Sequence, residues 1–114
     1  MAVALIERQA RIVNPLGMHA RPAAEFVKTA SRFKSAVQVS KDGLSVNGKS
    51  IMGVMMLAAE RGSFFSIRVE GDDAEPAMEA LLDLVAAGFN EMHLTGSDAD
   101  LEDIDDEPGE EARS

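Results

Sequence analysis

Apolar and polar residues alternate in four segments of the chain, and this period predicts four β-strands that each bury one face. Arg8 interrupts the apolar face of the first segment, whereas the fourth segment alternates without a break. Asp42-Gly43 separates the second and third segments and is a typical hairpin turn. The four predicted strands cover residues 6–13, 37–40, 44–47 and 65–70.

Three other segments place apolar residues at helical spacing. The first predicted helix covers residues 20–33, and a short second helix covers residues 50–57. The third follows the turn at residues 71–73, has Pro76 in its first turn and ends near Gly88-Phe89. The order is therefore β-α-β-β-α-β-α.

Strands that bury one face only are typical of antiparallel sheets with one covered side. We therefore predict an α/β (α+β) fold, an open-faced β-sandwich in which three helices pack on one face of a four-stranded antiparallel sheet. Residues 1–92 are expected to form one domain, followed by an acidic tail over residues 93–114.

The negative charge of the chain is concentrated near its C-terminal end. Residues 97–114 hold nine acidic residues and one base, a net charge of −8 out of −9 for the whole sequence, so the rest carries −1. Such a run is typical of a disordered, solvating extension. A role in screening partners or in autoinhibition is the alternative.

Composition excludes several classes of protein. The sequence has no cysteine, which excludes disulfides and thiolate metal sites. It has neither a membrane-spanning apolar run nor a signal peptide, so we expect a cytoplasmic protein without membrane contact. The absence of tryptophan, tyrosine and a basic patch argues against nucleic-acid binding. No cofactor or metal is expected.

His19 is the main candidate for chemistry. Histidine is largely neutral near pH 7 and nucleophilic at nitrogen, and here it stands at the expected N-cap of a helix. The N–H groups of Ala20 and Arg21 would face a bound phosphate, and the Arg21 guanidinium would clamp it. The simpler alternative is a surface or capping histidine. His93, the only other histidine, is interpreted as a solvated loop residue.

Ser50 is the expected N-cap of the short helix. The same position would receive a phosphate well, because a helix N-terminus favours added negative charge. Met52 and Met55, at helical spacing in this segment, suit either a core or a docking surface, and the pattern leaves both open. A partner-binding face is expected to comprise Met18, Lys49, Ile51, Met52 and Met55.

Two motifs and the segment between them resemble the histidine-containing phosphocarrier protein (HPr) family of the bacterial phosphotransferase system. They are Gly17-Met18-His19-Ala20-Arg21-Pro22-Ala23, Thr29-Ala30-Ser31-Arg32-Phe33 and Val46-Asn47-Gly48-Lys49-Ser50-Ile51-Met52-Gly53-Val54-Met55, within a resemblance that covers residues 6–92. The resemblance implies an open-faced sandwich. It also implies that the δ nitrogen of His19 takes a phosphoryl group from enzyme I and passes it to an enzyme IIA protein. Ser50 matches the family's regulatory serine, which HPr kinase/phosphorylase modifies in organisms that have it.

Some segments resemble the nitrogen-related branch of the family (NPr) instead. These are residues 14–19, where Leu16 replaces a small polar residue common in sugar systems, and Gly88-Phe89.

From the family resemblance we expect a monomeric phosphoryl carrier, which acts as a stoichiometric relay and not as a stand-alone enzyme. The alternative is a regulatory interaction module of a nitrogen-type system, switched by phosphorylation. A hydrolase that uses His19 as a base lacks a candidate nucleophile.

Overall fold

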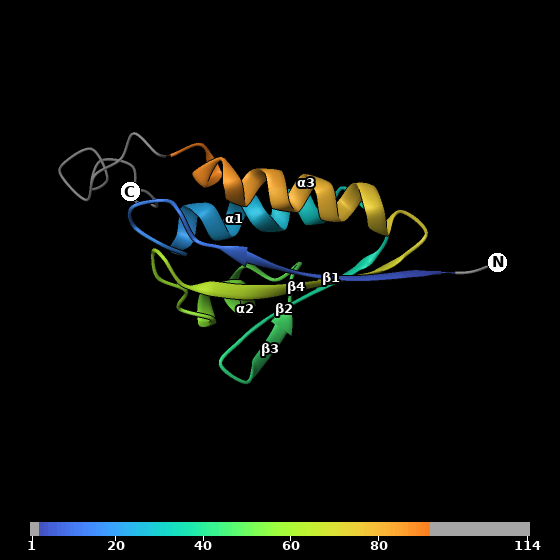
Figure 1. Cartoon of the computed structure of the whole chain (residues 1–114), viewed down its shortest axis with the longest axis horizontal. Helices are drawn as coiled ribbons and strands as arrows, with labels where there is room; N and C mark the ends of the chain where they lie inside the picture. Colours follow the sequence, from blue (N-terminus) through green and yellow to red (C-terminus); the bar gives the residue numbers. More distant parts are fainter. Residues whose placement is uncertain (1–2, 92–114) are drawn as a thin grey trace.

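The chain folds into a four-stranded antiparallel sheet with helices above one face (Figure 1). This computed structural model describes residues 3–91. Its elements are β1 (Ala4–Arg11), α1 (Ala20–Ala30), β2 (Ala36–Lys41), β3 (Leu44–Asn47), α2 (Ile51–Met56), β4 (Phe64–Gly71), α3 (Ala74–Ala86) and a 3-10 turn η1 (Gly88–Asn90). The predicted order β-α-β-β-α-β-α is confirmed.

The strands lie side by side in the order β1-β4-β2-β3. Val69 of β4 pairs with a β1 residue on one side and with Val37 of β2 on the other, so β4 is a central strand. Asp42 and Gly43 connect β2 to β3 with φ of 52° and 85°. Two left-handed residues are what a tight hairpin turn of the I′ type requires, which explains why Asp-Gly stands here.

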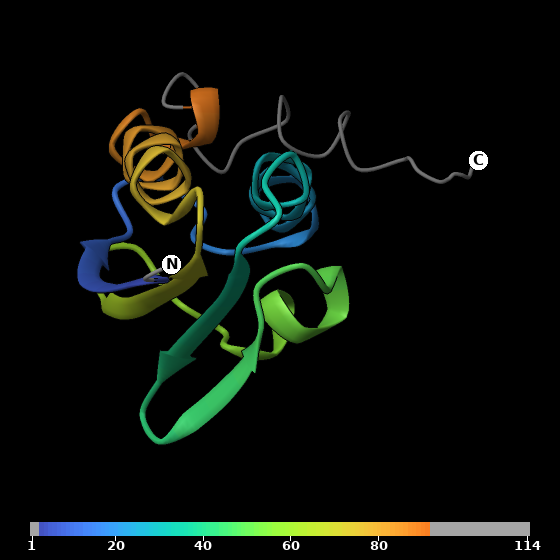
Figure 2. The same cartoon turned by 90° about the vertical axis from the view of Figure 1, so that its right-hand side faces the viewer.

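The core lies between the sheet and the two long helices, α1 and α3 (Figure 2). Phe26 of α1 meets Phe65 of β4 edge to face, with 6.2 Å between the ring centroids, and both side chains are almost fully buried. The short helix α2 lies at the β3 edge of the sheet and packs against α1 and β3. This packing places the C-terminal parts of the chain's two motifs on neighbouring helices.

The first helix and the first strand differ clearly from their predicted bounds. The first helix ends at Ala30 and not at residue 33, because the next residues turn more tightly: the N–H of Phe33 bonds to the carbonyl of Ala30. Phe33 still packs against the core, which explains its helical-looking spacing. The first strand is shifted toward the N-terminus and ends at Arg11, although Ile12 still bonds to Ser63.

Asp73 ties the start of β2 to the start of α3. Its carboxylate accepts hydrogen bonds from the N–H groups of Lys34 and Ser35, each at 2.9 Å, and from the Ser35 hydroxyl. The Ser35 hydroxyl, followed by the Lys34 N–H, lowers the pKa of Asp73 below its ordinary value. These hydrogen bonds lie beyond the C-terminal end of α1, and His19 is at its N-terminal end. They therefore stabilise the fold but do not position His19.

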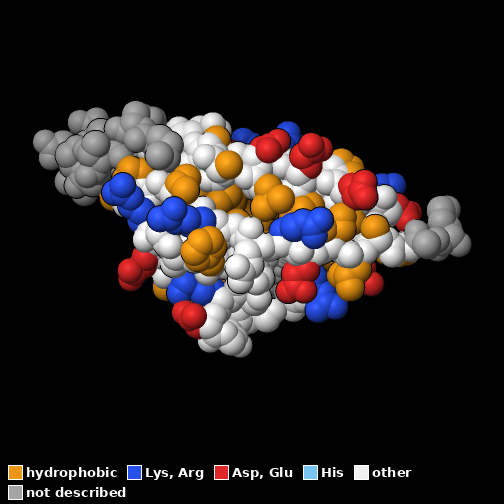
Figure 3. Space-filling view, in the orientation of Figure 1, with side chains coloured by type: hydrophobic (Ala, Val, Ile, Leu, Met, Phe, Trp, Pro, Cys, Tyr) orange, Lys and Arg blue, Asp and Glu red, His pale blue; other side chains and the backbone are white. Residues whose placement is uncertain are grey.

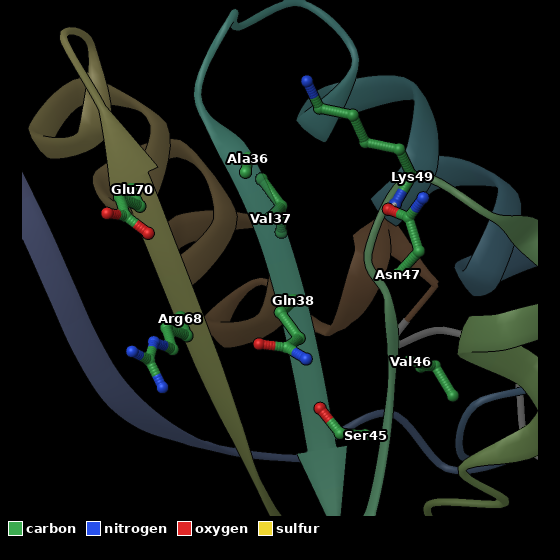
Figure 4. Close-up of a pocket in the computed structure, with 9 residues that line it drawn as sticks. All are labelled: Ala36, Val37, Gln38, Ser45, Val46, Asn47, Lys49, Arg68 and Glu70. Atoms are coloured by element: carbon green, nitrogen blue, oxygen red, sulfur yellow. Dashed lines mark hydrogen bonds between the residues drawn. The ribbon is translucent and has the colours of Figure 1, made fainter.

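The uncovered face of the sheet carries mainly polar side chains, together with the exposed Leu5 and Phe64. Figure 4 shows a shallow pocket on β2, β3 and β4, where Gln38, Ser45, Arg68 and Glu70 line a depression. Residues at these alternate positions face solvent, while their neighbours in the strands face the core. Within residues 3–91, no helix is both long and apolar enough to cross a membrane.

Removing residues 97–114 is expected to leave the fold intact. Those residues lie outside the described part of the chain, and every core residue of the described part falls between Ala10 and Phe89. Because the acidic segment has few apolar side chains to bury, its removal should change the melting temperature by no more than a few degrees. Thermal unfolding of the full chain and of residues 1–96 measures this. A large drop in the truncated chain would show that the tail belongs to the domain.

Candidate functional site

A glycine turn positions the loop between β1 and α1. Gly17 has a φ of +74°, and a Cβ at this position would lie 2.8 Å from the carbonyl oxygen of Ala59. The neighbouring N–H of Met18 donates to that same oxygen at 2.8 Å. Both the left-handed conformation and the close approach exclude other residues, so Gly17 sets where the next two residues lie.

His19 is the N-cap of α1, as predicted. Its backbone is extended, its carbonyl accepts from the N–H of Ala23 at 3.0 Å, and its side chain makes no capping bond. The N–H of Ala20, the first helical residue, has no preceding carbonyl in the helix, and Pro22 has no N–H. The imidazole is 26% exposed and stands at the positive end of the helix dipole. An anion near the ring would therefore be stabilised.

The chain returns to His19 after the last long helix. Three successive residues of the turn, Gly88, Phe89 and Asn90, have positive φ values of 65°, 55° and 63°. This reversal buries the Phe89 ring in the core and directs Glu91 inward, where it is 1% exposed. A glutamate is therefore buried directly beneath the candidate histidine.

The Glu91 carboxylate bonds to the imidazole. Its Oε1 lies 2.9 Å from Nε2 of His19 and accepts a second bond from Nδ2 of Asn14 at 3.0 Å. An ionised carboxylate only accepts hydrogen bonds, so this contact favours the tautomer that carries its proton on Nε2. Nδ1 then carries the ring's lone pair, and no hydrogen bond of Nδ1 is present within the described residues. The arrangement can perform nucleophilic chemistry at Nδ1.

Arg21 joins the same cluster. Its Nη1 lies 3.9 Å from Oε2 of Glu91, and its side chain is 36% exposed. The guanidinium thus lies beside the carboxylate that bonds to the ring, and it still reaches solvent. Lys and Arg side chains also gather around this end of the molecule, where α1 begins (Figure 3). Among the described residues, no three His, Cys, Asp or Glu side chains are arranged to hold a metal.

Ser50 is the N-cap of α2, as predicted, and its Oγ accepts from the N–H of Gly53 at 3.1 Å. The methionines of α2 do not belong to the core, which was one of the two alternatives that the pattern left open. Val54 and Leu57 supply the buried side of the helix. The other apolar side chains form an exposed surface, here called the α2 patch, which consists of Ile51 (43% exposed), Met52 (76%), Met55 (40%) and Met56 (63%).

Two residues expected on the partner-binding face lie elsewhere or are engaged. Met18 is only 6% exposed and belongs to the core, because the Gly17 turn directs it inward, so it offers a partner little surface. The ammonium of Lys49 donates to the carbonyl of Phe33 at 2.8 Å, which holds it against the end of α1. His93 lies outside the described residues.

Glu91 and Asn14 are the site residues that sequence analysis missed. Glu91 lies between the last predicted helix and the acidic residues 97–114, where a single carboxylate carries no signal of its own. Asn14 precedes a proline, so it is easily interpreted as a turn residue. Only the fold brings Glu91 to His19 and to Asn14, which lie 72 and 77 positions before it in the sequence.

Comparison with known proteins identifies the family. Residues 6–87 match the family described as the phosphotransferase system HPr component phosphorylation site. The chain is 47% identical over 87 residues to the phosphocarrier protein HPr of Neisseria meningitidis, covering 76% of this chain and 98% of that protein. It is also 47% identical over 78 residues to the HPr-like protein Crh of Halalkalibacterium halodurans, covering 68% of this chain and 93% of the relative.

A solved structure agrees with these matches. The crystal structure of HPr-C-His from Thermoanaerobacter tengcongensis superposes with a TM-score of 0.73 at 49% identity, over 75% of this chain and 97% of the other. The fold, the two motifs and the sequence matches all agree. The chain belongs to the HPr family of phosphocarrier proteins of the phosphotransferase system.

Proposed function

We propose that this chain accepts a phosphoryl group on Nδ1 of His19 from the phosphohistidine of enzyme I and donates it to a histidine of an enzyme IIA protein. The observation that supports this most directly is the hydrogen bond between Nε2 and Glu91, which leaves Nδ1 with the lone pair. The N-terminus of α1 and the Arg21 guanidinium surround the place where the phosphoryl oxygens would lie.

The transfer is a substitution at phosphorus. The Nδ1 lone pair of His19 forms a new N–P bond while the N–P bond of the donor histidine breaks, and the donor ring keeps that electron pair. The three oxygens of the phosphoryl group carry the negative charge, which the Ala20 N–H and Arg21 would stabilise. Passage to the acceptor is the same step with His19 as the leaving group, so the chain is restored after each cycle.

The α2 patch provides a contact surface for these partners. Four apolar side chains exposed on one short helix are unusual for a surface that remains in water, and methionine adapts to more than one partner surface. Because α2 packs against α1, a protein docked on this patch would lie beside His19. Enzyme I and an enzyme IIA protein would thus use one face in turn.

A reconstituted transfer assay tests the proposal. The full chain is incubated with enzyme I and labelled phosphoenolpyruvate, and enzyme IIA proteins of the sugar type and of the nitrogen type are then added separately. We expect acid-labile label on the chain and its passage to one IIA type. A chain that stays unlabelled by active enzyme I would contradict the carrier function.

The same assay separates the carrier from the alternative, a regulatory module switched by phosphorylation. The resemblance of this chain to Crh, named only as HPr-like, keeps that alternative in view. A module that only regulates has no use for an acceptor nitrogen held in this way, so we favour the carrier. Phosphorylation of His19 without passage to any IIA protein would favour the regulatory module.

We further propose that the chain is a monomer that acts in the cytoplasm.

Arg21→Ala is expected to fold normally and to slow transfer. The guanidinium is charged and partly exposed, so its removal leaves no cavity, but the transferring group loses a charge-assisted contact. Removal of one such donor costs roughly 3 kcal/mol of barrier, or about 100-fold in rate. The measurement is the single-turnover rate from enzyme I, with Lys28→Ala, a charge-matched change on the exposed side of α1, as the control. Equal rates in the two variants would refute the clamp.

A further inference from the structure

We propose that Glu91 is a positioning residue for phosphoryl transfer: its buried carboxylate holds the proton of His19 on Nε2 and so makes Nδ1 the nucleophile. The inference rests on the proposed function of His19. Glu91 lies beyond residues 6–87, the range matched by the description of the family's phosphorylation site, so that match says nothing about this glutamate.

The geometry leaves the carboxylate one role toward the ring. Glu91 is 1% exposed, so water competes little for its oxygens, and Oε1 lies 2.9 Å from Nε2 of His19. An ionised carboxylate can only accept hydrogen bonds, so the nitrogen that faces it must donate. A neutral imidazole has one N–H, and holding it at Nε2 leaves Nδ1 unprotonated.

Asn14 fixes the carboxylate in turn. Its Nδ2 donates to the carbonyl of Gly17 at 2.8 Å and to Oε1 of Glu91 at 3.0 Å, and the side chain is fully buried. The amide orientation is determined, because the Gly17 carbonyl can only accept and the atom facing it must be the nitrogen. Oε1 therefore receives two donors, and the carboxylate cannot rotate without losing both.

The negative charge of Glu91 is opposite to the positive charge that transfer creates on the imidazole ring. When Nδ1 bonds to phosphorus while Nε2 keeps its proton, the ring becomes cationic, and the carboxylate at 2.9 Å stabilises that cation. When the N–P bond breaks again, the ring leaves as neutral imidazole with the same proton on Nε2. Transfer in either direction thus needs no proton movement at Nε2.

The backbone around Glu91 supports a specific role. Phe89 and Asn90 adopt left-handed conformations, with φ of 55° and 63°, that cost energy for residues other than glycine. Burial of the Phe89 ring offsets this cost and fixes the chain reversal. The reversal carries Glu91 to His19, and strained backbone of this kind concentrates at functional sites.

The test combines a measurement of the tautomer with a measurement of the rate. Histidine-15N-labelled full-length chain is observed by NMR at a pH where imidazole is neutral, with His93→Gln used to assign His19. We expect the Nε2–H form to predominate in the unaltered chain and to give way to a mixture in Glu91→Ala. The single-turnover rate of phosphorylation by saturating enzyme I should fall about 10-fold or more, as when other histidines lose the carboxylate that orients them.

Two further variants keep the result interpretable. Glu79→Ala removes a glutamate from the exposed side of α3 and should change neither the tautomer nor the rate. Glu91→Gln keeps a side chain of the same size with an acceptor oxygen but without the charge, so it should fold if Glu91→Ala does not and should still slow transfer. A wild-type tautomer together with a rate within about twofold of wild type, in a folded Glu91 variant, would overturn the proposal.

Failure of this proposal differs from failure of the carrier function. The tautomer is measured without enzyme I, so it reports on Glu91 even if the chain is never phosphorylated. Efficient labelling of His19 with no dependence on Glu91 would remove the role of the glutamate and leave the carrier function standing. A role confined to docking would raise the enzyme I concentration needed for half-maximal rate and leave the saturated rate unchanged, which would also contradict the proposal.

Discussion

Replacement of His19 by alanine is expected to abolish phosphorylation of the chain by enzyme I and phosphoenolpyruvate. His19 is the only histidine within the described residues, it stands at the N-terminus of α1, and its ring is held by Glu91. No other described nitrogen nucleophile has that setting, so labelling should fall to background. The measurement is acid-labile label per chain after incubation with enzyme I.

The variant should remain folded, because the His19 side chain makes no capping bond and 26% of it is exposed. Circular dichroism before and after heating checks this. His93→Ala is the matched control, since it removes the other histidine of the sequence, and it should label as fully as the unaltered chain. Full labelling of His19→Ala would refute the carrier function.

Period-2 and helical patterns were sufficient to predict the order of the elements, because every strand of this sheet has one covered and one uncovered face. Ile67 and Val69 are buried while Arg68 between them is exposed, so the sequence alternates as the structure does. The end of α1 was predicted too late because Phe33 is apolar and packs on the core from a turn. Apolar spacing reports burial, and a turn can bury a side chain as well as a helix can.

Two methionines show where pattern alone fails. Met18 and Met52 each lie within one of the two motifs, yet one is 6% exposed and the other 76%. The difference comes from tertiary geometry: the Gly17 turn points Met18 inward, whereas α2 has its buried side filled by Val54 and Leu57. Sequence predicts that such residues are near the site, but only packing decides which of them a partner can touch.

The residues of the functional site also differ in whether the sequence alone could identify them. His19 and Arg21 are two residues apart and were identified from their motif, because helix N-terminal chemistry is local in sequence. Glu91 is 72 residues from His19, and it reaches the ring only through the left-handed turn after α3. A phenylalanine in that conformation has no sequence signature, so the orienting carboxylate could not be predicted.

Phosphorylation of Ser50 is expected to slow transfer to His19 strongly without unfolding the chain. The Ser50 Oγ caps α2 through the Gly53 N–H and adjoins Ile51 and Met52 of the α2 patch. A phosphate adds a charge of about −1.5 to −2 near neutral pH. A partner that docks on the patch must then desolvate this charge, at a cost of several kcal/mol, which corresponds to about 100-fold or more in rate.

Three substitutions at Ser50 and Ser45 separate the charge from the cap. Ser50→Ala removes only the cap, so it should lower stability by about 1 kcal/mol and leave the transfer rate unchanged. Ser50→Asp carries part of the phosphate's charge and should slow transfer less than phosphorylation does. Ser45→Asp places the same charge on the uncovered face of the sheet, in the lining of the pocket in Figure 4, and should have no effect.

The rate of phosphoryl transfer from enzyme I to His19, measured as a function of enzyme I concentration, decides between the two roles of Ser50. If the charge acts through the α2 patch, Ser50→Asp should raise the concentration needed for half-maximal rate, because binding is weakened and the geometry at Nδ1 is not. This differs from the effect expected for Glu91, which acts on the saturated rate. Equal rates at every concentration for the unaltered chain, Ser50→Ala and Ser50→Asp would mean that Ser50 is only a helix cap in this protein.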